Sequence, residues 1–274
     1  MLRVQRTFST VVPALSGYYI AGQTGLVPLI MLAATVFFLH ISANALNDLG
    51  DYESDKRNAP DRVLITGVLT KQQAAVLSVS LMVFGLSLAW MLDWLLFSIA
   101  ATLGVVLWMS YSFGTRLKDR PVGSFVYLSL STSTIPFLGG FIVMRNLHTS
   151  SAALALFLVV FTSSIMIISL KDIAGDRRAN KITIAVKFGE RRARELAISL
   201  ILVPIATYPL LWLVFGFSQI YLLYVTIPIL MRLIIAFLLS KNDVNTPRVL
   251  VRILIITDFA MLALARPEPG LSWL

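Results

Sequence analysis

Two acidic clusters at the ends of long apolar runs contain the residues of this 274-residue chain best suited to chemistry. Residues 47–55 of the first cluster read Asn-Asp-Leu-Gly-Asp-Tyr-Glu-Ser-Asp, and the second cluster contains Asp172 and Asp176. Carboxylates are costly near a bilayer, so clusters there usually mark a functional site. Two clusters that face each other could hold divalent metal, and the metal could hold a diphosphate.

The spacing of the first cluster predicts a polar stripe on one helix. If the preceding helix continues through the cluster at about 100° per residue, one quarter of its surface carries Asn47, Asp48, Asp51 and Asp55. His40 and Asn44 extend this face toward the membrane interior. Such a stripe should face a cavity rather than lipid. For His40 we weigh an acceptor contact or proton relay against a hydrogen bond between helices, and we favour the hydrogen bond.

Oxygen ligands without histidine or cysteine favour Mg²⁺ over transition metals. Asp172 and Asp176 repeat the four-residue spacing, and basic residues follow both clusters. Arginine and lysine so placed suit diphosphate oxygens. The competing interpretation, that both clusters are merely soluble helix ends, explains the matched spacing less well.

The elements that position these clusters are long apolar helices. The chain is 57% hydrophobic and 14% charged, which is typical of a multi-pass membrane protein. Nine runs approach spanning length: 8–22, 26–46, 72–91, 94–112, 123–144, 151–170, 196–215, 219–239 and 249–265. We therefore predict an all-α membrane protein, a bundle of nine transmembrane helices around a central cavity. Residues 1–274 would form a single domain, with cap loops at about 47–71 and 171–195 after the second and sixth helices.

The basic residues predict the orientation of this bundle. With the N-terminus in the cytoplasm, most of the 23 Lys and Arg residues fall in cytoplasmic segments. Both acidic clusters then lie on the cytoplasmic side. The net charge of +9 is explained by this topology and by anionic membrane lipid, so we expect no nucleic-acid partner.

At these residues the chain resembles the UbiA family of intramembrane prenyltransferases. Family members carry Asn-x₃-Asp-x₃-Asp after helix 2 and Asp-x₃-Asp after helix 6, which correspond to Asn47, Asp51, Asp55, Asp172 and Asp176. The similarity continues through residues 58–67, 111–118 and 176–189, and so extends over most of the chain. Val63 and Asn180 depart from the usual proline and glycine, which weakens any assignment to a subfamily but leaves the ligand positions intact.

The resemblance implies a Mg²⁺-dependent transfer of a prenyl group from a prenyl diphosphate. The five motif residues would be the catalytic metal ligands for two Mg²⁺ ions. Substrate contacts would come from Arg62, Lys118, Lys171, Arg177, Asn44, His40, Tyr111 and Asp48. Among these, Asp48 would tune a ligand or hold a lysine, and the basic residues would contact the diphosphate.

Two questions stay open at the level of the sequence. The acceptor would be a small molecule or a lipid: either an aromatic quinone precursor or a glycerol-phosphate lipid. A cation-coupled secondary transporter is the alternative of a different class, but its binding sites would be expected near the bilayer midplane.

Outside the clusters, Arg232, Arg252 and Asp258 lie in the last two runs, where an Arg–Asp pair facing the bundle would be structural. The small residues around Pro136 would allow close helix packing or line the cavity at a kink.

Overall fold

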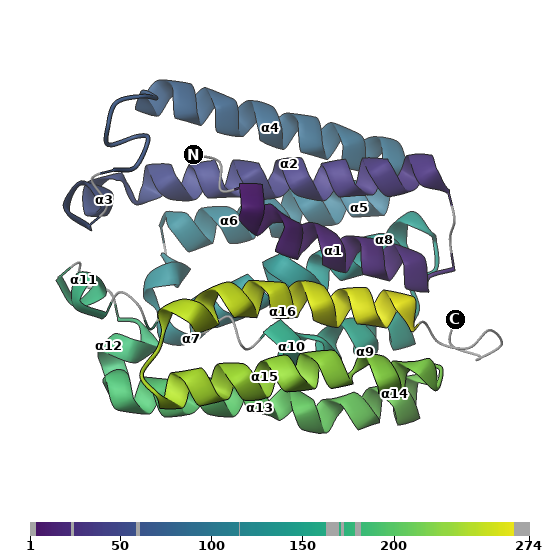
Figure 1. Cartoon of the computed structure of the whole chain (residues 1–274). Coiled ribbons are helices and arrows are strands. Elements are labelled where there is room, and N and C mark those ends of the chain that lie inside the picture. Colours follow the sequence, from purple (N-terminus) through teal and green to yellow (C-terminus); the bar gives the residue numbers. More distant parts are fainter. Residues whose placement is uncertain are drawn as a thin grey trace.

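The computed structural model describes residues 4–22, 25–58, 61–114, 116–162, 170, 173–178 and 182–265. The chain in these ranges forms a bundle of helices that run roughly along one common direction (Figure 1). The N-terminal half contains α1 (Val4–Ile20), α2 (Leu26–Gly50), α3 (Tyr52–Asn58), α4 (Lys71–Leu92), α5 (Trp94–Ile99), η1 (Ala100–Gly104), α6 (Val105–Ser112), η2 (Leu117–Asp119), α7 (Pro121–Ser129), η3 (Leu130–Thr134) and α8 (Ile135–Val143).

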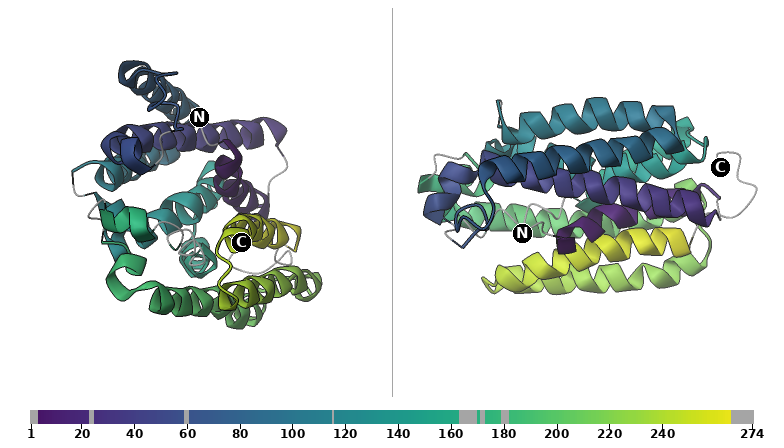
Figure 2. Two further views of the ribbon diagram at one scale, coloured as in Figure 1. Left: turned by 60° about the vertical axis from the view of Figure 1, so that its left-hand side comes forward. Right: turned by 90° about the horizontal axis from the view of Figure 1, so that it is seen from above.

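The C-terminal half contains α9 (Thr149–Phe157), α10 (Val159–Thr162), α11 (Ile173–Arg178), α12 (Ile184–Phe188), α13 (Glu190–Phe215), α14 (Ile220–Tyr224), α15 (Thr226–Ser240) and α16 (Asn245–Leu264). Helix α1 packs against α2, α8 and α16, whereas α4 lies outside the bundle against α2 (Figure 2). The short helices α3 and α11, which carry parts of the two acidic clusters, lie at the same end of the bundle.

The predicted all-helical architecture is confirmed, and every predicted apolar run is mostly helical in its described part. Six helical stretches in the described chain are long and apolar enough to cross a membrane by length and composition. They are Leu26–Gly50, Lys71–Leu92, Trp94–Ser112, Gly123–Val143, Glu190–Phe215 and Ile220–Ser240. Because α1 has 17 residues and α16 carries two arginines and an aspartate, the count of nine transmembrane helices stays a prediction.

Side-chain caps define where several helices begin. Thr70 and Gln73 form a capping box, in which the backbone amide of Gln73 donates to Thr70 Oγ1 at 3.1 Å. Helix α4 starts directly after Thr70, at Lys71. Asp93 separates α4 from α5 because its carboxylate accepts the Leu95 amide at 2.7 Å. Before α16, hydrogen bonds from the Thr246 side chain and from nearby backbone amides lower the pKa of the exposed Asp243 carboxyl.

Two of the long helices contain π-helical turns. Segment η1 interrupts the stretch from α5 to α6, and η3 interrupts the stretch from α7 to α8. Pro136 is the second residue after η3 and lacks an amide proton, and in an α-helix its ring would crowd the carbonyl four residues earlier. A π turn accommodates this proline without ending the helix.

Small residues bring α1 and α8 into backbone contact, as the sequence predicts. A Cβ atom added to Gly17 would lie 2.0 Å from the carbonyl oxygen of Phe137. One added to Gly140 would lie 2.1 Å from the backbone nitrogen of Tyr18. Only hydrogen fits at these two positions, so the glycines set the distance between the two helices.

An ion pair between α15 and α16 satisfies two charges inside the bundle. Arg232 and Asp258 have fully buried side chains, and Arg232 Nη2 lies 2.5 Å from Asp258 Oδ2. Tyr208 of α13 donates from its hydroxyl to Asp258 Oδ1 at 2.6 Å and accepts from Arg232 Nε at 2.8 Å. This confirms the predicted Arg–Asp pair and shows that a tyrosine completes it.

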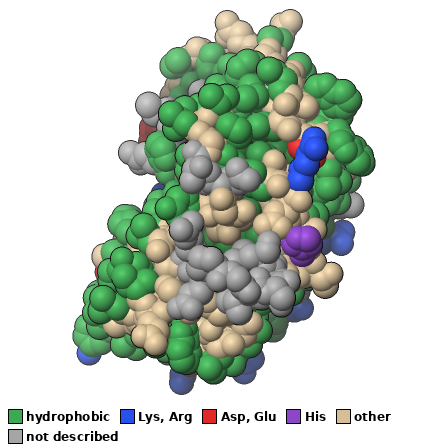
Figure 3. All heavy atoms as spheres, turned by 90° about the vertical axis from the view of Figure 1, so that its right-hand side faces the viewer, with side chains coloured by type: hydrophobic (Ala, Val, Ile, Leu, Met, Phe, Trp, Pro, Cys, Tyr) green, Lys and Arg blue, Asp and Glu red, His purple; other side chains and the backbone are tan. Residues whose placement is uncertain are grey.

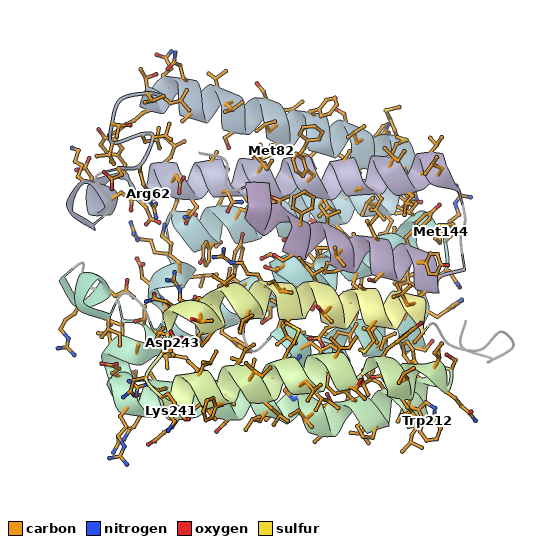
Figure 4. The ribbon with its side chains drawn as sticks, in the orientation of Figure 1. Arg62, Met82, Met144, Trp212, Lys241 and Asp243 are labelled. Carbon is orange, nitrogen blue, oxygen red and sulfur yellow. The ribbon has the colours of Figure 1, made fainter. Side chains whose placement is uncertain are left out.

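Charge is distributed unevenly between the two ends of the bundle. The end opposite the acidic clusters is covered mainly by hydrophobic side chains, with few charged ones (Figure 3). At the other end, Arg62 lies beside α3, and Lys241 and Asp243 lie between α15 and α16 (Figure 4). The molecule therefore has one polar end and one apolar end.

Candidate active site

The first acidic cluster forms a site where α2 passes into α3. The expectation of an uninterrupted helix through the cluster is wrong at Asp51, where the helix breaks with φ −93° and ψ 0°. Close packing requires a glycine just before the break, because a Cβ on Gly50 would lie 2.9 Å from the carbonyl oxygen of Ser112. Backbone hydrogen bonds still join Asp51 to Asn47 and Asp55 to Asp51, at 3.0 and 2.8 Å. The break therefore preserves the four-residue spacing of the three side chains.

Lysine and arginine side chains lie between these acidic groups. Lys118, with 6% of its side chain exposed, places Nζ 2.8 Å from Asp51 Oδ1 and donates to Asn47 Oδ1 at 3.1 Å. Arg62 joins the other two carboxylates, pairing closely with Asp55 and lying 3.2 Å from Asp48 Oδ1. Asp48 thus pairs with Arg62, which the loop before α4 brings back over α3.

The carboxylates of Asp51 and Asp55 are largely buried. Burial raises the pKa of the Asp55 carboxyl above its ordinary value, and the carboxylates of Asp51 and Asp48 act in the same direction. The Arg62 guanidinium opposes this shift. The site therefore concentrates negative charge and stabilises it with specific cations.

Sequence reasoning missed two further members of the site. Arg116 adopts a left-handed backbone conformation with φ 47°, and its Nη2 lies 3.8 Å from Asp51 Oδ1. Ser112 donates from Oγ to Asn47 Oδ1 at 3.3 Å. Arg116 lies between Tyr111 and Lys118, both predicted substrate contacts, and this proximity in the chain was an available signal.

The second cluster is described only in part. Lys171 and Asp172 lie outside the described residues. Asp176 is half-buried on α11, and Arg177 beside it is exposed. A backbone hydrogen bond of 3.0 Å from Ile182 to Asp119 joins the segment after this cluster to η2, which carries Lys118. The two clusters are therefore tied to the same end of the bundle through η2.

A cavity of about 370 Å³ begins at Asn47 and extends into the bundle. Its wall includes His40, Asn44 and Tyr111, so the inner part of the predicted polar stripe, from His40 to Asn47, faces a cavity. The His40 ring is also hydrogen-bonded to Thr10 of α1, with 3.1 Å between Nδ1 and Oγ1, as the favoured interpretation required. Tyr111 stacks on Tyr127 with 4.0 Å between ring centroids.

The rest of the wall is mostly apolar and includes residues from both π-helical turns. Ala100, Leu103 and Gly104 come from η1, and Ser131 and Thr132 come from η3. Leu96, Gly139 and Ile142 line the part farthest along α5 and α8 from the acidic cluster. The cavity thus joins a charged end to an apolar interior, which suits an amphiphile with a long hydrocarbon tail.

The residues fit a magnesium site in their chemistry. Asn47, Asp51 and Asp55 offer oxygen ligands only, and the Asn47 amide donates to Asp51 Oδ2 at 3.2 Å, so these side chains are in contact. Among the described residues, no three His, Cys, Asp or Glu side chains form a group that could hold a metal. The assignment of these residues as metal ligands stays a prediction, and the predicted ligand set also includes Asp172, which lies outside the described residues.

Comparison with known proteins decides the family. The chain matches the UbiA prenyltransferase family over residues 10–256. The chain belongs to the UbiA prenyltransferase family. It is a multi-pass integral membrane prenyltransferase.

Relatives and solved structures of this family cover nearly the whole chain. A digeranylgeranylglyceryl phosphate synthase from Methanobrevibacter smithii is 27% identical over 227 residues, which cover 80% of this chain and 79% of the relative. The apo structure of a UbiA homologue from Aeropyrum pernix K1 has a TM-score of 0.83 at 17% identity, covering 96% of this chain and 99% of the other. A UbiA homologue from Archaeoglobus fulgidus, solved bound to GPP and Mg²⁺, has a TM-score of 0.76 at 16% identity, covering 96% and 98%.

These findings confirm the predicted family, fold type and enzyme class. They give no support to the transporter alternative. The roles of the individual site residues stay predictions.

Proposed function

We propose that this UbiA-family enzyme transfers a prenyl group from a prenyl diphosphate to the hydroxyl of a glycerol-phosphate lipid, by ionisation of the allylic diphosphate. The observation that carries the proposal is the cluster of Asn47, Asp51 and Asp55, interleaved with Lys118 and Arg62, at the mouth of the cavity. Carboxylates for metal and cations for phosphate oxygens are both needed to hold a metal diphosphate.

In this proposal the two acidic clusters hold the metal. The ligands are Asn47, Asp51, Asp55, Asp172 and Asp176. Bound Mg²⁺, as two ions, would neutralise the charge that develops on the diphosphate as it leaves. Lys118 and Arg62 bind phosphate oxygens directly, and Lys171 and Arg177 would do so from the second cluster. In this assignment the motif residues hold metal and the four basic residues hold phosphate oxygens.

The bond changes follow from this arrangement. The allylic C–O bond breaks, and its electron pair leaves with the diphosphate. The acceptor hydroxyl oxygen forms the new C–O bond and loses its proton, which a diphosphate oxygen can accept. Trp108, Tyr111 and Tyr127 line the cavity and exclude water, which would otherwise capture the allylic cation.

The apolar wall and the names of relatives support the choice of substrates. A prenyl tail fits between Leu96, Ile99 and Ile142, which offer no polar group. The relative from Methanobrevibacter smithii is named for a glyceryl phosphate that carries two geranylgeranyl groups. Forming such a product requires geranylgeranyl diphosphate and a glyceryl phosphate that already carries one chain. An aromatic acceptor is the other acceptor class to be tested.

The polar end is proposed to face the cytoplasm, because basic side chains concentrate there. The chain has no cysteine, so a single one can report sidedness. We expect Glu53→Cys in sealed inside-out vesicles to react with a membrane-impermeant maleimide, and Leu147→Cys to react only after the vesicles are opened. The reverse pattern would overturn the orientation.

The enzymatic proposal is tested with purified protein, Mg²⁺, geranylgeranyl diphosphate and separate acceptors, reading product masses. We expect product with geranylgeranylglyceryl phosphate and none after chelation of the metal. Asp51→Asn and Asp172→Asn should abolish diphosphate release while the protein stays folded. Glu53→Gln is the matched control, because its side chain is 71% exposed and pairs only with lysines among the described residues. Full activity in both aspartate variants would refute the assignment.

A further inference from the structure

Halfway along the cavity, polar side chains interrupt its apolar wall. They come from three helices: Ser9 and Thr10 from α1, His40 and Asn44 from α2, and Arg252 from α16. His40 lies seven residues before Asn47, and Arg252 lies seven residues after the start of α16 at the polar end. At 1.5 Å per residue, both lie about 10 Å inside that end, so they face the cavity at a similar depth.

Arg252 differs from the other arginine inside the bundle. Arg232 is fully buried, and its charge is balanced by Asp258. Arg252 is half-buried and lines the cavity. An arginine inside the helix bundle of a membrane protein is costly, and arginines that face a cavity commonly lie on a substrate path.

The electrostatics of the cavity favour an anion. The described residues that line it include no aspartate or glutamate, while Arg252 contributes a permanent positive charge. Asn44 adds a donor: its Nδ2 atom is buried and has no hydrogen-bond partner among the described residues. A buried amide without a partner is unfavourable until a ligand accepts a hydrogen bond from it.

We propose that Arg252 and Asn44 bind the anionic headgroup of the acceptor and so determine acceptor specificity. The inference rests on the proposed function, since the group bound would be the phosphate of a glycerol-phosphate lipid. The planar guanidinium can donate two parallel hydrogen bonds to phosphate or carboxylate oxygens. With the headgroup bound at this depth, the acceptor hydroxyl would point toward Asn47, where the donor's allylic carbon would lie.

The test separates binding of the acceptor from binding of the donor. The variants are Arg252→Gln and Arg252→Lys, with Arg191→Gln as a control of equal charge, because Arg191 is 92% exposed and remote from the cavity. The probes are geranylgeranylglyceryl phosphate and its uncharged counterpart geranylgeranylglycerol. Trp108 lines the cavity, so its fluorescence can report binding without turnover.

We expect wild type to bind the phosphate probe more tightly than the uncharged one. Arg252→Gln should raise the KM for the phosphate acceptor about 10- to 100-fold, the range for loss of a charged hydrogen bond, and abolish the preference in binding. The KM for geranylgeranyl diphosphate should change little. Arg252→Lys should recover part of the loss, and Arg191→Gln should match wild type.

An unchanged acceptor KM and an unchanged preference in folded Arg252→Gln would overturn the inference. Failure of the proposed function has a different signature, because wild type itself would then make no product with the glyceryl phosphate acceptor. In that case the same variants are compared with an aromatic carboxylate acceptor, which presents the same kind of oxyanion. If wild type binds neither anion, the assignment of Arg252 is also wrong.

Discussion

The buried pair of Arg232 and Asp258 gives a quantitative test of how the bundle is held together. Replacing Asp258 with asparagine, or Arg232 with methionine, leaves the other charge buried at a side-chain exposure of 0%. Each single change should lower the free energy of unfolding by about 3–5 kcal/mol. Replacing both residues, with Met and Asn, removes both charges together and should cost less than the sum of the single changes.

The size of the coupling follows from the contacts. Arg232 donates to Asp258, to Tyr208 and to the Ile201 carbonyl oxygen, at 2.5, 2.8 and 3.3 Å. The double variant still disrupts the hydrogen bonds of the Tyr208 hydroxyl, so we expect a coupling energy of about 2–3 kcal/mol rather than full compensation. For the exposed pair of Arg191 and Glu195 on α13, the same cycle should give about 0.3–0.5 kcal/mol.

The cycle is measured by reversible unfolding in mixed micelles titrated with sodium dodecyl sulfate, followed by circular dichroism. The exposed pair provides the control in the same protein and detergent. If the two buried single variants lose no more stability than the exposed ones, or if their effects add within about 0.5 kcal/mol, the reasoning about the buried charges is wrong.

Three further outcomes are expected. Gly140→Ala should lower the thermal unfolding temperature, because the new Cβ would lie 2.1 Å from a backbone nitrogen. At Gly104 a new Cβ would meet nothing within 4 Å, so Gly104→Ala should unfold no earlier than wild type. An equal fall in unfolding temperature for both variants would contradict the packing argument. Lys118→Met should raise the KM for the prenyl diphosphate about tenfold or more, because it removes a cation from the acidic cluster. Lys56→Met, at the surface, should leave this KM unchanged. Both values are measured from the turnover of isotopically labelled prenyl diphosphate. Because the pKa of Asp243 is lowered in the folded state, its carboxylate stabilises the fold above a pH of about 4, and this contribution is lost as the pH falls through the folded-state pKa. The unfolding temperatures of wild type and Asp243→Asn should therefore converge at low pH. A difference between them that grows on acidification would contradict that sign.

Helical periodicity was sufficient to predict one wall of the cavity. His40, Asn44 and Asn47 fall on one face by spacing alone, and the structure places all three on the same cavity. The prediction worked because an α-helix fixes relative directions without reference to its neighbours. It failed at Asp51, where the helix breaks directly after Gly50, and Gly50 packs against Ser112 of the α6 segment, which is distant in sequence.

Pairings between distant segments could not be predicted in the same way. Lys118 meets Asp51 across 67 positions of sequence because η2 folds back under α2, and no local pattern specifies that fold. The partner of Asp258 was a related difficulty. The sequence places Arg232, Arg252 and Asp258 in the last two apolar runs, and only the packing of the helices decides that Arg232 pairs with Asp258. Membership of a helix could thus be predicted, but the choice of partner could not.

The π-helical turns have a consequence for how the cavity wall can vary. Each turn contains one residue more than an α-helix needs, so deleting one residue within Ala100–Gly104 would restore regular geometry without breaking the helix. The wider turn already absorbs the extra residue, so side chains beyond the deletion would keep their directions and Trp108 and Tyr111 would stay on the wall. The change would be confined to the lining residues of the turn itself, Ala100, Leu103 and Gly104. A single-residue gap in the middle of a spanning helix, which an alignment would normally reject, is therefore a change that this scaffold can accept, and it would alter the shape of the cavity without any substitution.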